Sequence, residues 1–284
     1  MKLKTPYPKK RLGQHFLKDG NIIRKIIARA DIIPGEPVLE IGPGTGELTA
    51  GLLAAGAVVT AIEADAGLSG FLAERFNDEI AEERLRIITA DALKVSFLEL
   101  ANGRAWRCVS NLPYNVSGPV ITKLINERLA FTSMTLMLQK EVAQRLVASP
   151  GGKAYGILSI LSQMHAGIEI AFDVGPSAFF PAPKVTSSVV ALTPLPAPRA
   201  NIPDEGFFRK TVTASFTGRR KTLANSLRPL GIPQEAVKDA IARCGIAGVR
   251  RGETLTIAEW AALSAELRAA AGKDAGQPPG VQPG

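Results

Sequence analysis

The stretch EIGPGTGELT, residues 40–49, decides the fold of this chain. It ends the apolar run VLEIG and opens an amphipathic segment, so it predicts a turn from a strand into a helix. Gly42, Gly44 and Gly46 allow a tight turn and let a ligand approach bare N–H groups at the start of the helix. Their spacing is G-x-G-x-G and differs from the G-x-G-x-x-G of dinucleotide-binding turns. A glycine turn alone is weak evidence for a ligand, because any strand-to-helix bend can use one.

Short apolar runs alternate with amphipathic segments from Val38 to about Leu195. Five runs predict buried strands: VLEIG, VVTAIEA, LRIITAD, RCVSNL and MTLMLQ. EADAGLSGFLAERF and GILSILSQMHA carry apolar residues at helical spacing. This alternation predicts an α/β fold, in which a largely parallel sheet has helices on both sides. The later run SSVVALTPL is expected to close the sheet as an antiparallel strand.

Length and composition indicate a folded protein with one large and one smaller domain. The chain has 284 residues, of which 46% are hydrophobic and 21% are charged. The proline-rich stretch TPLPAPRANIP predicts a linker, and a mostly helical unit follows it. The last helix of that unit is expected to begin at a capping box formed by Thr256 and Glu259. Leu255 and Trp260 flank this box as a hydrophobic staple.

The net charge of +8 and the pI near 9.6 favour a polyanionic partner. Nine basic residues and one acid lie between the N-terminus and Arg29, and a second basic cluster is Arg219-Arg220-Lys221. Charge alone suits equally well a soluble protein that is simply basic.

Several features predict where the protein works. No apolar run is long enough to span a bilayer, and the basic N-terminus lacks the apolar core of a signal peptide. Cys108 and Cys244 lie far apart without metal-type spacing, so no metal site is expected. The simplest setting for two such thiols is a reduced cytoplasm.

Acidic residues end the second and third predicted strands. A carboxylate at Glu63 can accept both hydroxyls of a ribose, while Asp65 is better placed to cap the following helix. Asp91 can accept from the exocyclic amine of adenine, although on its own it suits a helix cap more often than a ligand. Because ligands of open α/β sheets bind at successive strand ends, the glycine turn and these two acids together predict an adenosyl pocket.

The fourth predicted strand ends in SNLPYN, and with it the chain resembles S-adenosylmethionine-dependent methyltransferases that act on an exocyclic base amine. Their signature is (D/N)-x-P-(Y/F). More narrowly, KKRLGQHFL, EIGPGTGELT, SNLPYN, FFPAPKV and FTGRRKTLANSL together resemble the small-subunit ribosomal RNA adenine N6,N6-dimethyltransferases, which are kin of the erythromycin-resistance methylases. The resemblance covers Lys9 to Trp260. It implies a Rossmann-like class I methyltransferase fold with a smaller C-terminal helical domain.

Composition, charge and the resemblance together give an expected division of the chain and a set of ligand-binding residues. The expected segments are a basic arm over the cofactor site (1–30), a catalytic domain (31–196), a helical RNA-contacting domain (203–270) and a disordered tail (271–284). The residues implied to contact S-adenosylmethionine are His15, Leu17, Gly42, Gly44, Glu63, Asp91, Ala92 and Asn111. The residues expected to contact RNA are Lys10, Arg11, Arg219, Arg220 and Lys221. Without the resemblance, GQHFL would be interpreted as an arm that merely packs. Thr186 stands where relatives of this kind have Asp in P-K-V-D-S, so no role is assigned to that position.

The chemistry of an aromatic amine explains the residues of SNLPYN. The exocyclic nitrogen of adenine is a poor nucleophile because its lone pair is delocalised into the ring. The Asn111 side-chain oxygen and the Leu112 carbonyl can hold the amine hydrogens, and Pro113 stiffens the turn that carries them. Such fixed dipoles stabilise the positive charge that develops on nitrogen, and water can take the proton.

The target base must also leave its stack. Tyr114 is expected to lie against one face of the base and, by resemblance, Phe179 against the other. Phe180 is expected to pack inside the protein. Aromatic residues beside prolines are, on residue type alone, as often loop packing as base-stacking groups.

The leading hypothesis is an enzyme that dimethylates two adjacent adenosines in the 3′-terminal hairpin loop of small-subunit (16S) ribosomal RNA. Its expected partner is the immature 30S subunit, and a further role in subunit assembly and a monomeric state are predicted. One alternative is an RNA-binding assembly factor whose catalysis is incidental. Another is a DNA adenine methyltransferase, although the helical unit is short for a module that reads sequence.

Overall fold

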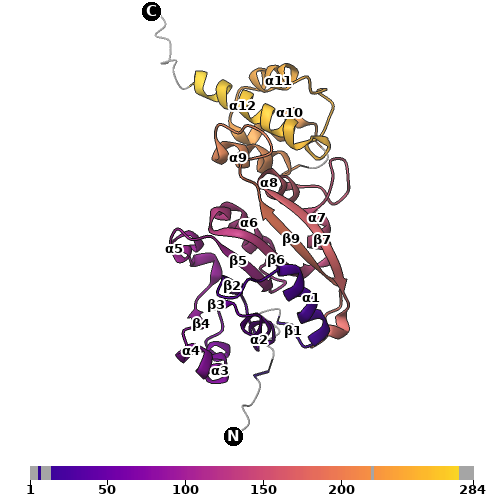
Figure 1. The fold of residues 1–284 in the computed structure, drawn as a ribbon. Helices are drawn as coiled ribbons and strands as arrows, with labels where there is room; N and C mark the ends of the chain where they lie inside the picture. Colours follow the sequence, from indigo (N-terminus) through magenta and orange to yellow (C-terminus); the bar gives the residue numbers. More distant parts are fainter. Residues whose placement is uncertain (1–5, 8–13, 219–220, 275–284) are drawn as a thin grey trace, which may run out of the picture. The chain divides into compact units, whose positions relative to one another are not determined.

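The computed structural model describes residues 6–7, 14–218 and 221–274, which form two compact units. The first comprises residues 1–147 and 166–194, and the second comprises residues 148–165 and 195–284. In Figure 1 the strands belong to the first unit, while the second is helical.

A seven-stranded sheet organises the first unit, in the order β4-β3-β2-β5-β6-β9-β7. The strands that the apolar runs predict are β2 (Pro37–Ile41), β3 (Val58–Glu63), β4 (Leu85–Thr89), β5 (Trp106–Asn111) and β6 (Phe131–Gln139). Every pair of neighbouring strands within this set of five is parallel, which confirms the predicted parallel sheet.

Two further strands run antiparallel beside β6. β9 (Ser187–Pro194) pairs with β6 and with β7 (Ala166–Val174), so the predicted antiparallel strand is confirmed. It does not close the sheet, however, because β7 lies outside it. The first six residues of β9 are buried, whereas Glu169 and Ile170 of β7 are exposed. A run of small and apolar residues thus occupies an interior position, and a run with charged positions forms the edge.

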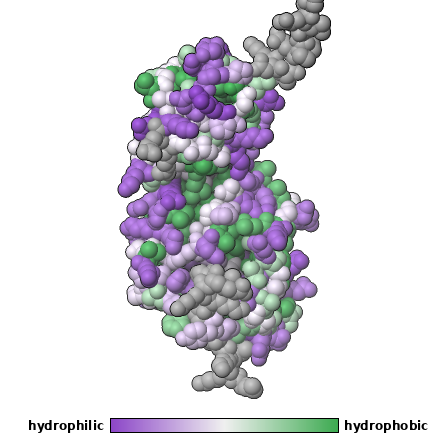
Figure 2. Space-filling view, turned by 180° about the vertical axis from the view of Figure 1, so that it is seen from behind, coloured by the Kyte–Doolittle hydropathy of each residue, from purple (hydrophilic) through white to green (hydrophobic). Residues whose placement is uncertain are grey.

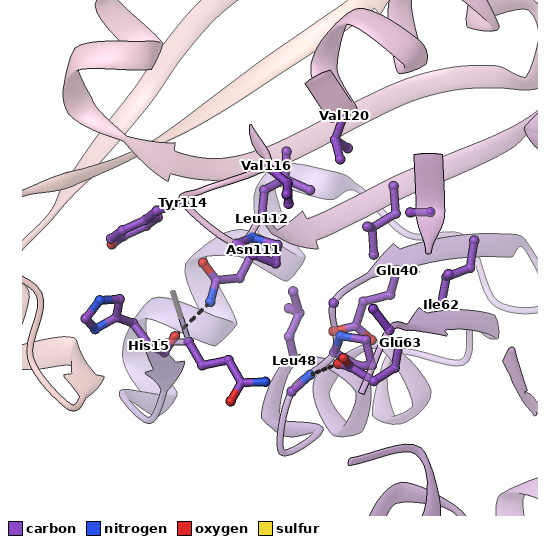
Figure 3. Close-up of a pocket in the computed structure, with 18 of the residues that line it drawn as sticks. His15, Glu40, Leu48, Ile62, Glu63, Asn111, Leu112, Tyr114, Val116 and Val120 are labelled. Atoms are coloured by element: carbon purple, nitrogen blue, oxygen red, sulfur yellow. Dashed lines mark hydrogen bonds between the residues drawn. The ribbon is translucent and has the colours of Figure 1, made fainter. Parts of the chain in front are cut away.

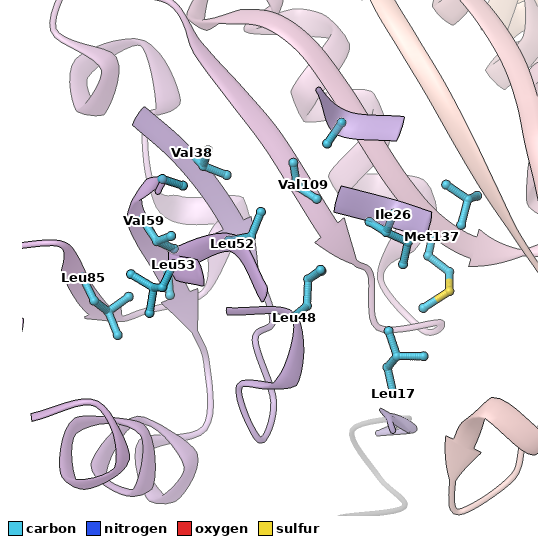
Figure 4. Packing of buried hydrophobic residues seen from close by; sticks show 14 of the residues in the cluster. Leu17, Ile26, Val38, Leu48, Leu52, Leu53, Val59, Leu85, Val109 and Met137 are labelled. Atoms are coloured by element: carbon cyan, nitrogen blue, oxygen red, sulfur yellow. The ribbon is translucent and has the colours of Figure 1, made fainter. Parts of the chain in front are cut away.

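Helices cover both faces of the sheet, as expected. Those of the first unit are α1 (Gly20–Ala30), α2 (Glu47–Ala54), α3 (Ala66–Arg75), α4 (Asn77–Ala81), α5 (Phe97–Ala101), α6 (Ser117–Asn126) and α7 (Lys140–Leu146). Val38 and Val109 face the core cluster shown in Figure 4, together with Leu52 of α2. Their strand neighbours Leu39 and Cys108 point to the opposite face and are also fully buried. The central strands β2 and β5 are therefore covered on both faces at these positions.

Two short strands tie the N-terminal segment to the loop before β9. β1 (Phe16–Leu17) pairs antiparallel with β8 (Phe179–Phe180), with Phe16 opposite Phe180 and Leu17 opposite Phe179. Single 3-10 turns are Ala92–Lys94, Arg128–Ala130, Pro176–Ala178, Arg228–Leu230 and Gly252–Thr254.

The second unit has its own core. Its helices are α8 (Ile157–His165), α9 (Glu205–Ser215), α10 (Leu223–Ser226), α11 (Gln234–Arg243) and α12 (Ile257–Asp274). The predicted capping box starts α12: Thr256 N–H donates to Glu259 Oε2 at 2.7 Å, and Glu259 N–H donates to Thr256 Oγ1 at 3.2 Å. Leu255 and Trp260 beside it are fully buried. α12 extends to Asp274, beyond the predicted start of the tail at 271, and residues 275–284 lie outside the described part of the chain.

The structure moves one predicted domain boundary. Residues 148–165 are expected within the catalytic domain, but they belong to the second unit. The apolar face of α8 is the reason: Ile160 and Met164 are fully buried in a cluster with Phe208 of α9 and Trp260 of α12. The predicted helical pattern of this segment is confirmed, but its packing partners lie after the proline-rich linker.

The second unit carries most of the net charge. It contains 14 Lys and Arg residues against 8 Asp and Glu residues, whereas the first unit contains 20 against 18. Hydrophilic side chains cover much of the helical unit in Figure 2. Among the helices of the described residues, none has the length and apolar character needed to cross a bilayer.

Candidate active site

A cavity of about 330 Å³ opens at the carboxyl ends of β2, β3 and β5. The predicted site residues that line it are His15, Leu17, Gly42, Gly44, Glu63, Asp91, Ala92, Asn111, Leu112, Pro113 and Tyr114. Figure 3 shows several of them around this space. The structure therefore brings together every residue that is expected to contact the cofactor, and the contacts themselves stay predictions.

The glycine turn brings main chain close to the cavity. Gly42, Gly44 and Gly46 have φ values of 68°, 61° and 86°, in the left-handed region that favours glycine. A Cβ added to Gly46 would lie 2.6 Å from Phe76 Cε2, and one added to Gly44 would lie 3.0 Å from Phe16 Cδ1. At Gly44 and Gly46 a side chain is thus disfavoured both by backbone conformation and by space.

Glu63 is a buried carboxylate that ends β3. It accepts from Gly44 N–H at 3.3 Å (Figure 3). It also accepts from Asp65 N–H at 2.9 Å. Burial raises the pKa of Glu63, and these two N–H groups oppose the rise. Asp65 caps α3 by accepting from Gly67 N–H, as expected. Two main-chain donors thus orient the Glu63 carboxylate, whose remaining lone pairs suit ribose hydroxyls.

Asp91 lines the same cavity and also caps a 3-10 turn. Its side chain accepts from Leu93 N–H at 3.0 Å. The capping role that its sequence position suggests is therefore present. A carboxylate has four acceptor positions, so the cap leaves Asp91 able to accept from an adenine amine as well.

The Asn111 side chain combines a paired NH₂ group with a carbonyl oxygen that no described residue pairs. Its Nδ2 donates to the main-chain carbonyl of His15 at 3.4 Å (Figure 3). Its Oδ1 is buried and has no hydrogen-bond partner among the described residues. Because a carbonyl can only accept, the contact with His15 orients the amide with Oδ1 as the unused atom. A buried acceptor left unpaired costs roughly 1–3 kcal/mol, which indicates that a ligand donor belongs there.

The rest of the SNLPYN loop is held on several sides. Leu112 N–H donates to Met137 O at 3.0 Å. The Tyr114 hydroxyl lies 2.5 Å from Ser187 Oγ, and the Tyr114 ring centroid lies 5.2 Å from that of His15, with the planes at 31°. Burial raises the pKa of Tyr114, and the Ser187 hydrogen bond lowers it in part. His15 Nδ1 in turn lies 2.7 Å from the carbonyl oxygen of Pro181.

Phe179 is not brought to the cavity. Only 5% of it is exposed, and it packs in the core cluster with Leu17 and Val174. Its neighbour Phe180 is 43% exposed, with Lys18 Nζ 4.1 Å from its ring centroid. The expectation that Phe180 packs inside is therefore wrong. Successive residues of a strand point to opposite sides, and the pairing with β1 turns Phe179 inward.

Comparison with known proteins identifies the family. A family model described as Ribosomal RNA adenine dimethylase matches residues 7–269. The chain belongs to this family. The Ribosomal RNA small subunit methyltransferase A of Geobacter sulfurreducens is 43% identical over 270 residues, which cover 93% of this chain and 96% of the relative. The protein of the same name from Clostridium botulinum is 43% identical over 256 residues, which cover 90% of this chain and 92% of the relative.

Solved structures agree with this membership of the dimethylase family. A dimethyladenosine transferase from Plasmodium falciparum has a TM-score of 0.73 at 27% identity, covering 90% of this chain and 98% of that one. The 23S rRNA methyltransferase ErmE has a TM-score of 0.65 at 23% identity, covering 89% and 99%, and supports the fold alone. The predicted class I methyltransferase fold with a helical C-terminal region is confirmed, and the dimethylase is an S-adenosylmethionine-dependent enzyme that methylates ribosomal RNA.

The cavity of the dimethylase fits this methyl donor. Its walls combine an oriented carboxylate at Glu63, a glycine turn at a helix start, and an acceptor at Asn111 that no other described residue pairs. Among the described residues, no group of three or more His, Cys, Asp or Glu side chains is placed to hold a metal ion.

The predicted RNA contacts of the dimethylase fall mostly outside the described part of the chain. Lys10, Arg11, Arg219 and Arg220 are not among the described residues. Lys221 is described, and it is exposed in the second unit. The contacts of these five residues with RNA stay predictions.

Glu40 of the dimethylase is a site residue that the sequence reasoning on strand ends misses. It lies inside β2, lines the cavity, is almost fully buried, and accepts from Thr49 Oγ1 at 2.7 Å. Burial raises the pKa of Glu40 from 4.5 to about 8; the Thr49 bond opposes the rise, and the Glu63 carboxylate adds to it. An acid two residues before the first glycine of the turn, inside an otherwise apolar strand, is the signal that could have revealed it.

This buried acid predicts a pH dependence of stability. The pKa of Glu40 is higher in the folded than in the unfolded enzyme, so folding favours the protonated form. The free energy of unfolding of the ligand-free enzyme should therefore fall as pH rises from about 4.5 to about 8. For this one group the fall in the free energy of unfolding is at most about 1.4 kcal/mol per pH unit.

Urea unfolding at several pH values measures this free energy. In Glu40→Gln it should fall less with rising pH than in the wild-type enzyme. The matched control Glu74→Gln, an exposed position in α3, should keep the wild-type slope; equal slopes for all three proteins would contradict the prediction.

Proposed function

We propose that this enzyme dimethylates the N6 amines of two adjacent adenosines in the 3′-terminal hairpin loop of small-subunit ribosomal RNA. The observation that carries the proposal is the Oδ1 of Asn111 at the cavity, which is buried and has no hydrogen-bond partner in the part of the chain that the structure describes. An adenine amine supplies the hydrogen that this atom lacks. The names of the relatives from Geobacter and Clostridium point to the small subunit as the source of that adenine.

The SNLPYN loop would prepare the amine for attack. Asn111 Oδ1 and the Leu112 carbonyl would each accept one amine hydrogen and direct the nitrogen lone pair into the cavity. S-adenosylmethionine supplies an activated methyl group on a sulfonium. As positive charge develops on the amine, the two oxygens stabilise it more than they stabilise the neutral base. Water would then take the proton, because an N-methylated adeninium is acidic. After the first methylation and loss of a proton the amine keeps only one hydrogen, so in the second methylation the two acceptors share it.

Two aromatic rings are assigned to the extruded base. Tyr114 lines the cavity and would support one face of the base, since stacking contributes about 1–3 kcal/mol per base. The resemblance assigns the other face to Phe179. Because Phe179 is buried behind the pairing of β1 and β8, that contact requires this two-stranded sheet to shift.

The substrate would be the immature 30S subunit rather than protein-free RNA. The excess of basic residues in the helical unit, together with Lys10, Arg11, Arg219, Arg220 and Lys221, suits phosphate contacts. We further propose that the enzyme works as a monomer in the cytoplasm. Cys108 and Cys244 are free thiols, which suits a reducing compartment.

One incubation tests the proposed reaction. Purified enzyme, S-adenosylmethionine labelled in its methyl group, and small subunits from cells that lack the modification are combined, and the RNA is digested to nucleosides. The expected product is N6,N6-dimethyladenosine at two moles per mole of subunit. Fully modified subunits and naked DNA serve as controls and should take up no label. Label in DNA, or methyladenosine at a single site only, would overturn the proposal.

A further inference from the structure

Ser187 is the one polar side chain among the described residues that the structure pairs with the Tyr114 hydroxyl. It is fully buried, and its Oγ lies 2.5 Å from the Tyr114 hydroxyl oxygen. We propose that Ser187 is a positioning residue, which holds the Tyr114 ring in place to receive the target adenine. This inference rests on the proposed function, because it assigns a role within the same site.

The main chain around Ser187 is fixed by three strands. Ser187 begins β9, where it lies opposite Gln139 of β6 and Val174 of β7. The carbonyl of the preceding residue, Thr186, accepts from Lys140 N–H at 3.0 Å. Because β9 runs antiparallel to β6, its first residue lies at the edge where the parallel strands end. A rigid interior strand therefore presents the Ser187 hydroxyl at the edge that holds the cavity.

Tyr114, in contrast, comes from a loop. It lies between the end of β5 at Asn111 and the start of α6 at Ser117, and its side chain is only partly buried. A hydrogen bond at the far end of the side chain fixes the direction of the ring axis, which the loop alone would leave free. His15 contacts one face of the ring and is itself held at Pro181. A ring that is already immobile loses less conformational entropy when a base stacks on it, so the contact favours base capture.

A purely structural role would be to satisfy a buried hydroxyl in the sheet. The neighbouring residue makes that comparison possible. Ser188 is also fully buried in β9, and its Oγ donates to Asp173 Oδ1 at 2.6 Å. Ser188→Ala thus also removes a fully buried serine hydroxyl from β9, but it leaves the hydrogen bond of Tyr114 intact.

The test compares Ser187→Ala, Tyr114→Phe, the double variant and Ser188→Ala in single-turnover methylation of undermodified small subunits. Ser187→Ala and Tyr114→Phe should each lower kcat/KM for the subunit by about 3–10-fold, the range expected for one side chain that must be immobilised on binding. The double variant should lose no more than either single variant, because both remove the same bond. The Kd of S-adenosylmethionine should change less than about twofold, Ser187→Thr should restore most of the rate, and Ser188→Ala should keep the wild-type rate.

A second readout needs no substrate. The readout is the NMR spectrum of enzyme whose tyrosine rings are labelled with carbon-13. The chain has three tyrosines, and the signal that disappears in Tyr114→Phe is that of Tyr114. Ser187→Ala should shift or broaden only that signal. Wild-type rates in Ser187→Ala, losses that multiply in the double variant, or an unchanged Tyr114 signal would overturn the inference. Failure of the wild-type enzyme to methylate small subunits would instead overturn the proposed function and leave the ring signal as the test of the contact. If Ser187→Ala does not fold, Tyr114→Phe removes the same bond from the loop side.

Discussion

Replacement of Asn111 by alanine should lower the rate of methyl transfer by about 10²–10³-fold, the range found when one preorganised dipole is removed from an active site. The Oδ1 atom is buried and unpartnered among the described residues, and the contact with His15 already orients it, so it stabilises the developing charge without rearrangement. Cofactor affinity should fall much less, because this oxygen is assigned to the amine. Single-turnover rates at saturating S-adenosylmethionine measure the effect.

Two further variants sharpen this prediction. Asn126→Ala removes an exposed amide at the end of α6, away from the cavity, and should keep the wild-type rate. Asn111→Asp keeps an acceptor but loses the donor to His15, and it should fall between wild type and Asn111→Ala. A rate for Asn111→Ala within about threefold of wild type would rule out the amide as the amine acceptor. Normal subunit maturation in cells that carry this variant, with no methylation, would favour the assembly role.

Replacement of Glu63 by glutamine should weaken S-adenosylmethionine binding by roughly 10–100-fold. Hydrogen bonds to a charged acceptor contribute about 1.5–3 kcal/mol, and about 1.4 kcal/mol corresponds to a factor of ten in Kd. Glutamine also places an NH₂ group among the N–H donors of Gly44 and Asp65, which now bind the carboxylate. Calorimetric titration measures Kd directly, and the KM for the methyl donor should rise more than kcat falls.

The control for this carboxylate is Glu74→Gln, which removes an exposed charge from α3. It should bind the methyl donor as wild type does, so a loss specific to Glu63 reflects the cavity and not overall charge. An unchanged Kd for Glu63→Gln would show that the ribose is held elsewhere. The adenosyl assignment of this strand end would then have to be abandoned.

The parallel strands can be predicted because a strand that is buried on both faces has a continuous apolar run in the sequence. The site can be predicted because the polar side chains that follow such runs lie at the same edge of a parallel sheet. Sequence alone therefore groups Gly42, Glu63 and Asn111 at one site. The inner position of β9 and the packing of α8 cannot be predicted, since both depend on partners that are distant in sequence. The inward turn of Phe179 follows from its register with Leu17, and the contact of Ser187 with Tyr114 crosses 73 residues. Residue type gives no signal for such pairings.

The chain passes from the sheet unit to the helical unit and back, and this has a consequence for how the enzyme can be taken apart. Residues 148–165 leave the first unit before β7 and β9 are complete, so the first unit is discontinuous in sequence. A truncation after Pro194 would keep α8 but strip Ile160 and Met164 of their neighbours in α9 and α12. The two parts cannot be exchanged between homologues by a fusion at a single junction; a working chimera needs matched crossovers near 147, 166 and 195.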